Sequence, residues 1–218
     1  MLRRREFAMD RGEALARLCT ARVVRFATTL ADGEPVLRTV NPIVHENWLA
    51  FHGAPSGEKA RCIGRDAVFQ WDEVVATIPS YFVDPERACP ATTFYRSVQV
   101  RGRLERLDEP ELKAVLLRRL MEHYQPEGGY APLRADSPLY ANALRGVLVL
   151  GVRLTDVTGK RKLGQGRKQQ ELTAILEGLW ARGEEGDPLA IEAILSANPD
   201  VPVPSFLRGP EGTRLVCA

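Results

Sequence analysis

Residues 36–61 read VLRTVNPIVHENWLAFHGAPSGEKAR, and this stretch decides the fold. It holds two segments with the period-two alternation that is typical of β-strands, Val36 to Val44 and Trp48 to His52. Pro42 lacks a backbone N–H, so we expect it at a sheet edge or a bulge. Ser56 is expected to cap a short helix that runs to about Ile63.

Working outward, four more segments have strand patterns and no alternating βαβ units separate them, which argues against a parallel sheet. Antiparallel strands joined by hairpins, with helices at the rim, predict a small closed or split β-barrel of the mainly β, α+β class. The four segments are Arg22 to Leu30, Val68 to Val75, Tyr95 to Leu107 and Arg145 to Asp156.

Two pairs of acidic residues have the spacing of a helix capping box. Asp10 with Glu13 predicts the start of a first helix, and Asp108 with Glu111 predicts a second that ends near Tyr124. The pattern also indicates a short helix over 137–144.

The character of the chain changes after Gly159, where a basic stretch from Lys160 to Lys168 begins. Two helical patterns follow, Gln169 to Ala181 and Pro188 to Ala197. We therefore expect a barrel domain over 1–158 and a basic segment with a helical C-terminal extension over 159–218.

Composition limits the classes of function. The 218 residues carry 30 basic and 28 acidic side chains, and this balance gives no reason to expect nucleic-acid binding. The longest apolar run, Gly146 to Val152, is far shorter than the roughly 20 residues that cross a bilayer. Four scattered cysteines without a CxxC spacing argue against a zinc site and fit a reducing, cytoplasmic location.

Three residues of the opening stretch are suited to binding phosphate. Arg38 offers a planar fork, Lys59 a point charge and Ser56 a hydroxyl group at a helix start. Each residue by itself is more often merely solvated. The set across adjoining elements indicates a phosphorylated aromatic cofactor, with flavin mononucleotide (FMN) as the leading candidate.

His52 ends a strand beside this turn. Its imidazole can donate to a flavin edge or to a substrate, and it titrates near neutral pH. A hydrogen-bonded histidine at a barrel rim explains the position equally well. On the strand from Tyr95, Ser97 can contact cofactor carbonyls, although an ordinary amphipathic strand is the alternative.

The segments RVVRFATTLADGEPVLRTVNPIV, LAFHGAPSGEKAR and ACPATTFYRSVQVRGRLERL resemble the FMN-binding split-barrel family related to pyridoxamine 5'-phosphate oxidase. Within that family the chain is most similar to the nitroimidazole-resistance proteins. The resemblance covers about 4–158, and its most specific part is the combination of FHxxxxGxK with YRSVxVxG.

The resemblance implies a six-stranded antiparallel split β-barrel that forms a homodimer, with FMN in clefts at the subunit interface. It places phosphate-binding residues on the first two of these segments, flavin-ring contacts beside them and one contact from the second subunit. The phosphate residues are Arg38, Thr39, Ser56 and Lys59, the ring residues are Val40, Asn41, His52 and Gly53, and the contact across the interface is Ser97.

The C-terminal part departs from the oxidase pattern, because the Trp and Arg substrate motif is absent. Pyridoxamine phosphate oxidation is therefore not expected. The segment GKRKLGQG is similar instead to the end of the FMN-binding negative transcriptional regulators, and Lys160, Lys162 and Gln165 match that motif. These residues reach the cofactor phosphate or the substrate, or they form a solvated basic linker.

Together these features predict a cytoplasmic, homodimeric flavoprotein that passes electrons from a reduced nicotinamide to a small acceptor such as a 5-nitroimidazole. In this hypothesis FMN carries the redox chemistry and His52 supplies a proton. The alternatives are an FMN-binding transcriptional regulator that uses the basic C-terminal segment, and a non-catalytic flavin- or haem-binding protein with His52 as the haem ligand.

Overall fold

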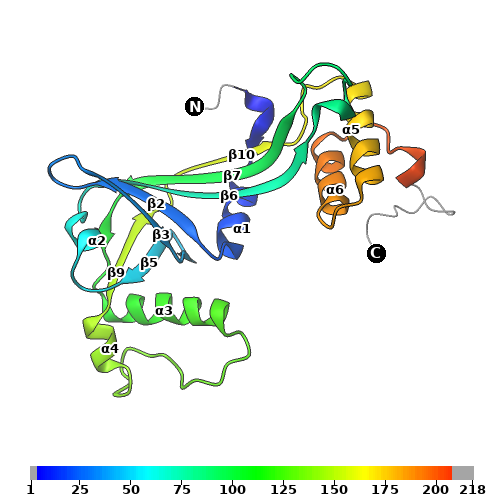
Figure 1. Cartoon of the computed structure of the whole chain (residues 1–218). Coiled ribbons are helices and arrows are strands. Elements are labelled where there is room, and N and C mark those ends of the chain that lie inside the picture. The colour runs from blue at the N-terminus through cyan, green and yellow to red at the C-terminus, as the bar shows by residue number, and fades with distance from the viewer. Residues whose placement is uncertain (1–3, 208–218) are drawn as a thin grey trace. The chain divides into compact units, whose positions relative to one another are not determined.

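A computed structural model describes residues 4–207 (Figure 1). The strands are β1 (Ala8–Met9), β2 (Val24–Thr29), β3 (Pro35–Val40), β4 (Ile43–His45), β5 (Trp48–Gly53), β6 (Asp66–Ile78), β7 (Thr92–Arg103), β8 (Glu105–Arg106), β9 (Leu148–Arg153) and β10 (Asp156–Lys162). The α-helices are α1 (Arg11–Thr20), α2 (Glu58–Arg61), α3 (Pro110–Tyr124), α4 (Ala141–Gly146), α5 (Gln169–Arg182) and α6 (Asp187–Ala197), and three 3-10 turns are η1 (Arg5–Phe7), η2 (Ser80–Phe82) and η3 (Ser205–Leu207). No helix within 4–207 has the length and apolar character needed to cross a membrane.

The strands form two sheets, and the chain divides into two compact units. One sheet has the order β1-β10-β7-β6-β2-β3, and the other has the order β4-β5-β9-β8. Of the described residues, unit 1 comprises 4–9, 72–97 and 160–207, and unit 2 comprises 10–71 and 98–159. The strands β6, β7 and β10 each have residues in both units.

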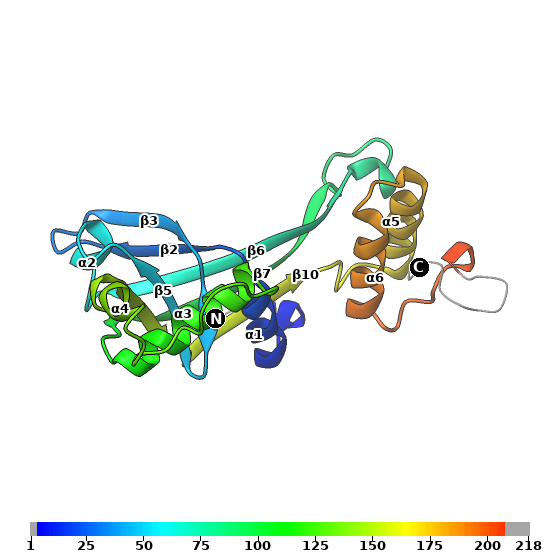
Figure 2. The ribbon, with the colours of Figure 1, turned by 90° about the horizontal axis from the view of Figure 1, so that it is seen from below.

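Unit 2 contains the split barrel that the sequence predicts. The strand β2 pairs antiparallel with β3 and with β6, and β5 pairs antiparallel with β4 and β9. Three phenylalanines fill the space between the two sheets, Phe26 from β2, Phe69 from β6 and Phe51 from β5, with ring centroids 5.1 to 5.8 Å apart. Figure 2 shows β2 and β3 running side by side as a long hairpin.

Two predicted strands are each divided where the chain passes from one sheet to the other. The segment 36–44 is split at Asn41 and Pro42, so β3 belongs to the larger sheet and β4 to the smaller. The segment 95–107 is split at Leu104, which exchanges hydrogen bonds with Arg65 and Gly64, both 2.8 Å, before β8 pairs with β9. The mainly β class is confirmed, with ten strands in the described part of the chain because of these breaks and two added strands, β1 and β10.

The predicted N-cap is confirmed for α1 and is wrong for α3. The Asp10 side chain accepts from the backbone N–H of Glu13 at 2.9 Å and starts α1, as predicted. The prediction that Asp108 caps α3 is wrong, because the cap is Glu109. Pro110 suits the first position of the helix and shifts its start by one residue.

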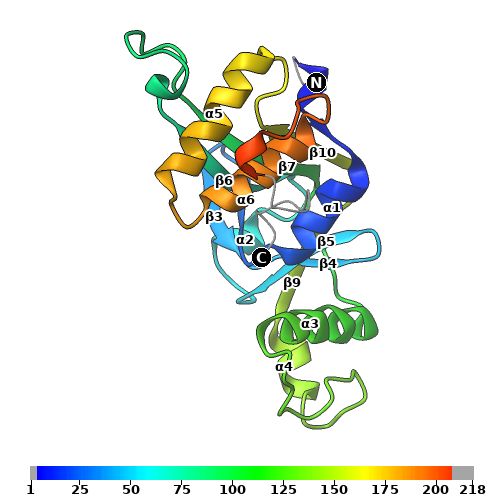
Figure 3. The same cartoon turned by 90° about the vertical axis from the view of Figure 1, so that its right-hand side faces the viewer.

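The helix α3 nonetheless ends at Tyr124 as expected, and α4 follows it along the chain. The two lie close together in space (Figures 1 and 3).

Unit 1 holds a second core around α5 and α6. These two helices pack together and cover apolar residues at the end of β6 and the start of β7. Both helices agree with the predicted ranges. The lysines at 160 and 162, expected in a segment beyond the last strand, instead form the end of β10.

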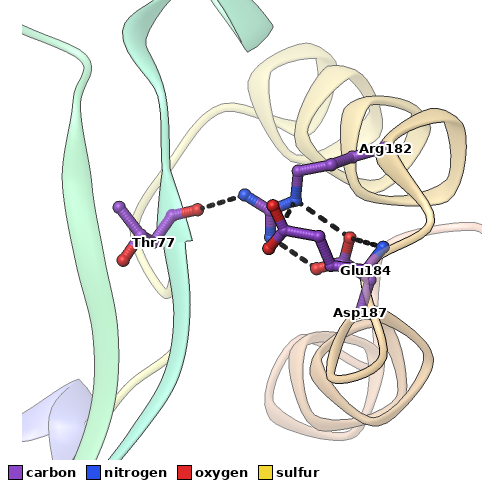
Figure 4. A network of polar contacts seen from close by, with 4 residues as sticks. All are labelled: Thr77, Arg182, Glu184 and Asp187. Atoms are coloured by element: carbon purple, nitrogen blue, oxygen red, sulfur yellow. Dashed lines mark hydrogen bonds and ion pairs between the residues drawn. The ribbon is translucent and has the colours of Figure 1, made fainter.

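An arginine joins the two helices to β6 (Figure 4). The Arg182 guanidinium donates at 2.9 Å to the backbone carbonyl of Thr77 and pairs with the buried carboxylate of Asp187. Burial opposes ionisation of Asp187, but hydrogen bonds from Arg182 and from the backbone N–H of Glu184 outweigh it and lower its pKa. A paired and fully hydrogen-bonded carboxylate can remain charged inside a protein.

Gly178, in the middle of α5, makes room for the ring of Phe82. A Cβ atom at Gly178 would lie 2.5 Å from ring carbon Cγ of Phe82. Real Cβ atoms essentially never come so close, so the aromatic ring or the helix would have to move. The glycine therefore sets how closely η2 approaches α5.

We expect Gly178→Ala to destabilise the protein by about 1–3 kcal/mol, because overpacking at Phe82 outweighs the gain in helix propensity. Thermal unfolding measures the change. Gly146→Ala is the matched control, since it is also helical and has open space at its Cβ. A Gly178→Ala protein as stable as this control would contradict the close contact.

Candidate functional site

The first part of the site is the edge strand β3, which carries Arg38. Arg38 lies opposite Phe26 in the register and has about half of its side chain exposed. Its Nη1 donates to the backbone carbonyl of Leu37 at 2.7 Å, and its Nη2 lies 2.6 Å from Oε2 of Glu58. This ion pair connects β3 with the start of α2.

The second part is the turn between β5 and α2. The prediction that Ser56 caps a helix to Ile63 is wrong, because α2 has only four residues and its N-cap is Gly57. Gly57 has φ of 109°, a conformation that glycine adopts easily, and no side chain caps this helix. Ser56 is exposed one residue before the cap.

The third part is the end of β5, where His52 and Gly53 follow four buried residues. The side chain of Lys59 extends over Gly53, since a Cβ atom there would lie 3.1 Å from Cε and 3.8 Å from Nζ of Lys59. Loss of hydration, and then the charge of Lys59, lowers the pKa of His52 from its usual 6.5. At neutral pH His52 is therefore mainly a neutral ring with one N–H donor.

Three more predicted residues lie at the end of β3. Thr39 is exposed opposite Arg25 in the register. The side chain of Val40 is buried, so only its backbone can face a ligand. The side-chain amide of Asn41 donates to the backbone carbonyl of Arg22 at 3.0 Å and holds the corner before β4.

The other predicted residues belong to unit 1 and form a group of their own. Nζ of Lys160 lies 5.2 Å from the centre of the Tyr95 ring, a cation–π distance. Lys162 donates to the hydroxyl of Thr92. Gln165 bonds its own loop, accepting from the N–H of Leu163 at 2.8 Å and donating to the carbonyl of residue 161 at 3.2 Å.

Ser97 is half-buried on β7, in the same unit. The predicted residues thus fall into a unit 2 group around Arg38, His52 and Lys59, and a unit 1 group around Lys160 and Lys162.

Sequence reasoning did not include Glu58 in the site. Its carboxylate is the partner of Arg38 and lies next in sequence to Lys59. An acidic residue directly before a candidate phosphate-binding lysine is the signal that was available. In unit 2 the site thus contains two cations, one carboxylate and a neutral imidazole, a set suited to an anionic ligand with a polar planar part.

The arrangement of two sheets around a shared core defines a split-barrel protein. A model of the pyridoxamine 5'-phosphate oxidase family matches residues 10–161, and the chain belongs to this family. A comparison of the sequence with curated proteins gave no match.

Solved structures with a similar fold have low sequence identity. The flavocytochrome Anf3 from Azotobacter vinelandii is 17% identical with a TM-score of 0.64, and the similarity covers 79% of this chain and 78% of that one. A FAD and heme binding protein from Mycobacterium smegmatis is 19% identical with a TM-score of 0.59, covering 77% and 79%. A putative 5-nitroimidazole antibiotic resistance protein from Bacteroides thetaiotaomicron is 21% identical with a TM-score of 0.53, covering 70% and 85%.

The contact between Lys59 and the end of β5 is tested by titration of His52. Lys59→Met removes the positive charge that opposes protonation, so the pKa of His52 should rise toward its usual value. Proton NMR titration measures the change, with the resonance assigned through His52→Gln.

The control is Arg61→Met, an exposed cation on the same short helix that does not contribute to the pKa shift of His52. It should leave the pKa of His52 unchanged. An equal rise in both variants would mean that net charge, rather than the position of Lys59, sets the pKa.

Proposed function

We propose that this protein binds a flavin and that Arg38, Lys59 and the hydroxyl groups of Ser56 and Thr39 hold its phosphate. The observation that carries the proposal is that α2 begins against both β3 and β5, because its Glu58 pairs with Arg38 and its Lys59 lies over Gly53. Membership of the pyridoxamine 5'-phosphate oxidase family supports it. So do the names of two structural relatives, a flavocytochrome and a FAD and heme binding protein.

FMN is the flavin that we propose, because the two cations of the unit 2 group, Arg38 and Lys59, are sufficient for one phosphate group. A bound flavin supplies the electron transfer. The protein contributes the positive charge of Arg38 and Lys59 for the phosphate. It contributes the backbone of Val40 and Gly53 for ring contacts. Asn41 fixes the corner that follows Val40, between β3 and β4.

His52 is proposed to act through its neutral imidazole. The ring N–H donates a hydrogen bond to the flavin edge or to a substrate. A phosphate dianion beside Lys59 offsets the charge that lowers the pKa of His52, so the bound state favours protonation more than the free state does. When the cofactor is bound, a larger fraction of His52 is therefore protonated and able to donate a proton.

The reaction that we propose is electron transfer from a reduced nicotinamide to a small acceptor, with a 5-nitroimidazole as the first compound to test. The protein is proposed to act in the cytoplasm as a homodimer with the cofactor at the interface. The likeness to a nitroimidazole resistance protein motivates the choice of acceptor. The transcriptional regulator is the weaker alternative, because 30 basic against 28 acidic side chains give the chain little excess charge for DNA.

The absorption spectrum of the purified protein is the primary test. We expect flavin bands, and chromatography of the released cofactor should identify FMN. Release of FAD would keep the flavin proposal and change the cofactor. A Soret band that His52→Ala removes would favour haem binding through His52, and the absence of any flavin, with none bound on addition, would overturn the proposal.

Replacement of Arg38 tests the phosphate contact. We expect Arg38→Met to weaken FMN affinity by roughly tenfold or more, because a charge-assisted hydrogen bond is lost. Fluorescence quenching of FMN measures affinity. Arg61→Met removes the same charge from the exposed side of α2 and should have a much smaller effect. Equal losses in the two variants would show a general electrostatic effect and no contact at Arg38.

Glu58 competes with the phosphate for Arg38, so Glu58→Gln should tighten FMN binding several-fold. The substitution keeps the size of the side chain and removes the negative charge that lies 2.6 Å from the guanidinium. The same fluorescence titration measures it. If Glu58→Gln weakens binding as much as Arg38→Met does, Glu58 instead holds Arg38 in position.

A further inference from the structure

A second candidate site is a pocket of about 410 Å³ that lies wholly within unit 1. Four cationic residues line it, Arg4, Lys162, Arg167 and Lys168, together with the carboxylate of Glu171. A second carboxylate lies beside the lining, since a Cβ atom at Gly166 would be 3.8 Å from Oε1 of Glu6. Glu171 is already paired with Arg167 at 3.3 Å. Among the described residues the four cations thus outnumber the two nearby carboxylates, and the volume of the pocket suits a small molecule.

The loop that forms one side of the pocket is fixed in place. Gly164 has φ of 91°, and a Cβ atom there would lie 2.5 Å from Cδ2 of the buried Leu172. Gln165 closes the loop through its two hydrogen bonds. The side chain of Asn198 donates at 2.9 Å to the carbonyl of Leu163. Because the loop is packed on the core of unit 1, the cations that follow it are held near one another before any ligand binds.

The start of α5 breaks the usual rule for helix N-termini. The N-cap is Lys168, with no side-chain cap, and Arg167 precedes it. Serine, threonine, aspartate and asparagine are preferred at this position, and a cation is unfavourable beside the positive end of a 14-residue helix. An anion in the pocket would relieve this repulsion and accept hydrogen bonds from first-turn amides.

We propose that this pocket binds a small phosphate-bearing molecule. Lys162 and Lys168 contribute charge, and the first turn of α5 contributes backbone donors. Arg167, which donates at 3.1 Å to the carbonyl of Pro90 and pairs with Glu171, holds the wall of the pocket. The site goes beyond the proposed flavin function, because its lining consists of unit 1 residues while the proposed flavin phosphate group lies in unit 2. The experiment below separates it from the cofactor or substrate role that the resemblance implies for Lys162 and Gln165.

An exposed thiol in the lining, Cys89, serves as a reporter. The protein as purified, with any cofactor retained, is treated with iodoacetamide with and without inorganic pyrophosphate at equal ionic strength. Peptide mass spectrometry follows each cysteine. We expect saturating pyrophosphate to slow alkylation of Cys89 several-fold and to leave Cys19, an exposed thiol in unit 2, unaffected.

Charge reversal at the pocket should abolish this protection. Lys168→Glu removes the cation at the N-cap, and Arg118→Glu on α3 is the matched control that should keep the protection of Cys89. Isothermal titration of the unmodified protein with pyrophosphate gives an independent readout if Lys168→Glu fails to fold. No binding heat, equal protection of Cys19, or full protection in Lys168→Glu would each overturn the proposal.

The phosphate group in the pocket could belong to the bound flavin or to a separate ligand, and release of the cofactor distinguishes the two. If pyrophosphate displaces a bound flavin from the unmodified protein but not from Lys168→Glu, measured by absorbance after ultrafiltration, the pocket holds the cofactor's own phosphates and a separate ligand is excluded. Displacement from both proteins would place the competition at Arg38 and Lys59, and the protection of Cys89 then decides whether the pocket is a second site. If pyrophosphate protects Cys89 while the flavin stays bound, the separate site is supported. A protein that binds no flavin but shows protection would refute the proposed function and leave this site intact.

Discussion

The barrel of unit 2 depends on the corner at Asn41 and Pro42, where the chain passes from one sheet to the other. The chain leaves the larger sheet at Val40 and joins the smaller one at Ile43, and Pro42, which has no N–H to donate to a strand ladder, lies in the corner between them. The amide of Asn41 fixes the corner on the carbonyl of Arg22. This transfer brings the two sheets face to face and lets the rings of Phe26, Phe51 and Phe69 meet between them.

The candidate site follows from the same corner. Strand β3 presents Arg38 just before it, and the hairpin after it returns the chain along β5 to His52 and Gly53. The turn into α2 then places Glu58 against Arg38 and Lys59 over Gly53. The apolar core positions the strands, while the charges lie where the strands end and the backbone is accessible. Binding groups at the ends of a rigid scaffold are a common way for a fold to acquire a function.

The sequence predicts those features that depend on local periodicity or on one dominant residue. The period-two segments, the cap at Asp10 and the two C-terminal helices belong to this class. The cap at Asp108 failed because Pro110 is better placed one residue later, and the cap at Ser56 failed because the conformation of Gly57 decides where α2 begins. β10 lacks an apolar alternation, and the pairing of Glu58 with Arg38 depends on tertiary contact, so neither has a local signal.

The two units use a similar local device with opposite charge balance. In each, a glycine at positive φ precedes a short run of charged residues at a helix start, Gly57 before Glu58 and Lys59, and Gly166 before Arg167 and Lys168. At α2 the carboxylate comes first, which suits the helix dipole and neutralises Arg38. At α5 two cations stand just before the helix, Arg167 and the N-cap Lys168, and the acid of the first turn, Glu171, pairs with Arg167. A structural role alone would favour an acid or a hydroxyl at the N-cap of α5, so the cation at Lys168 is better explained by an anion that comes from outside the chain.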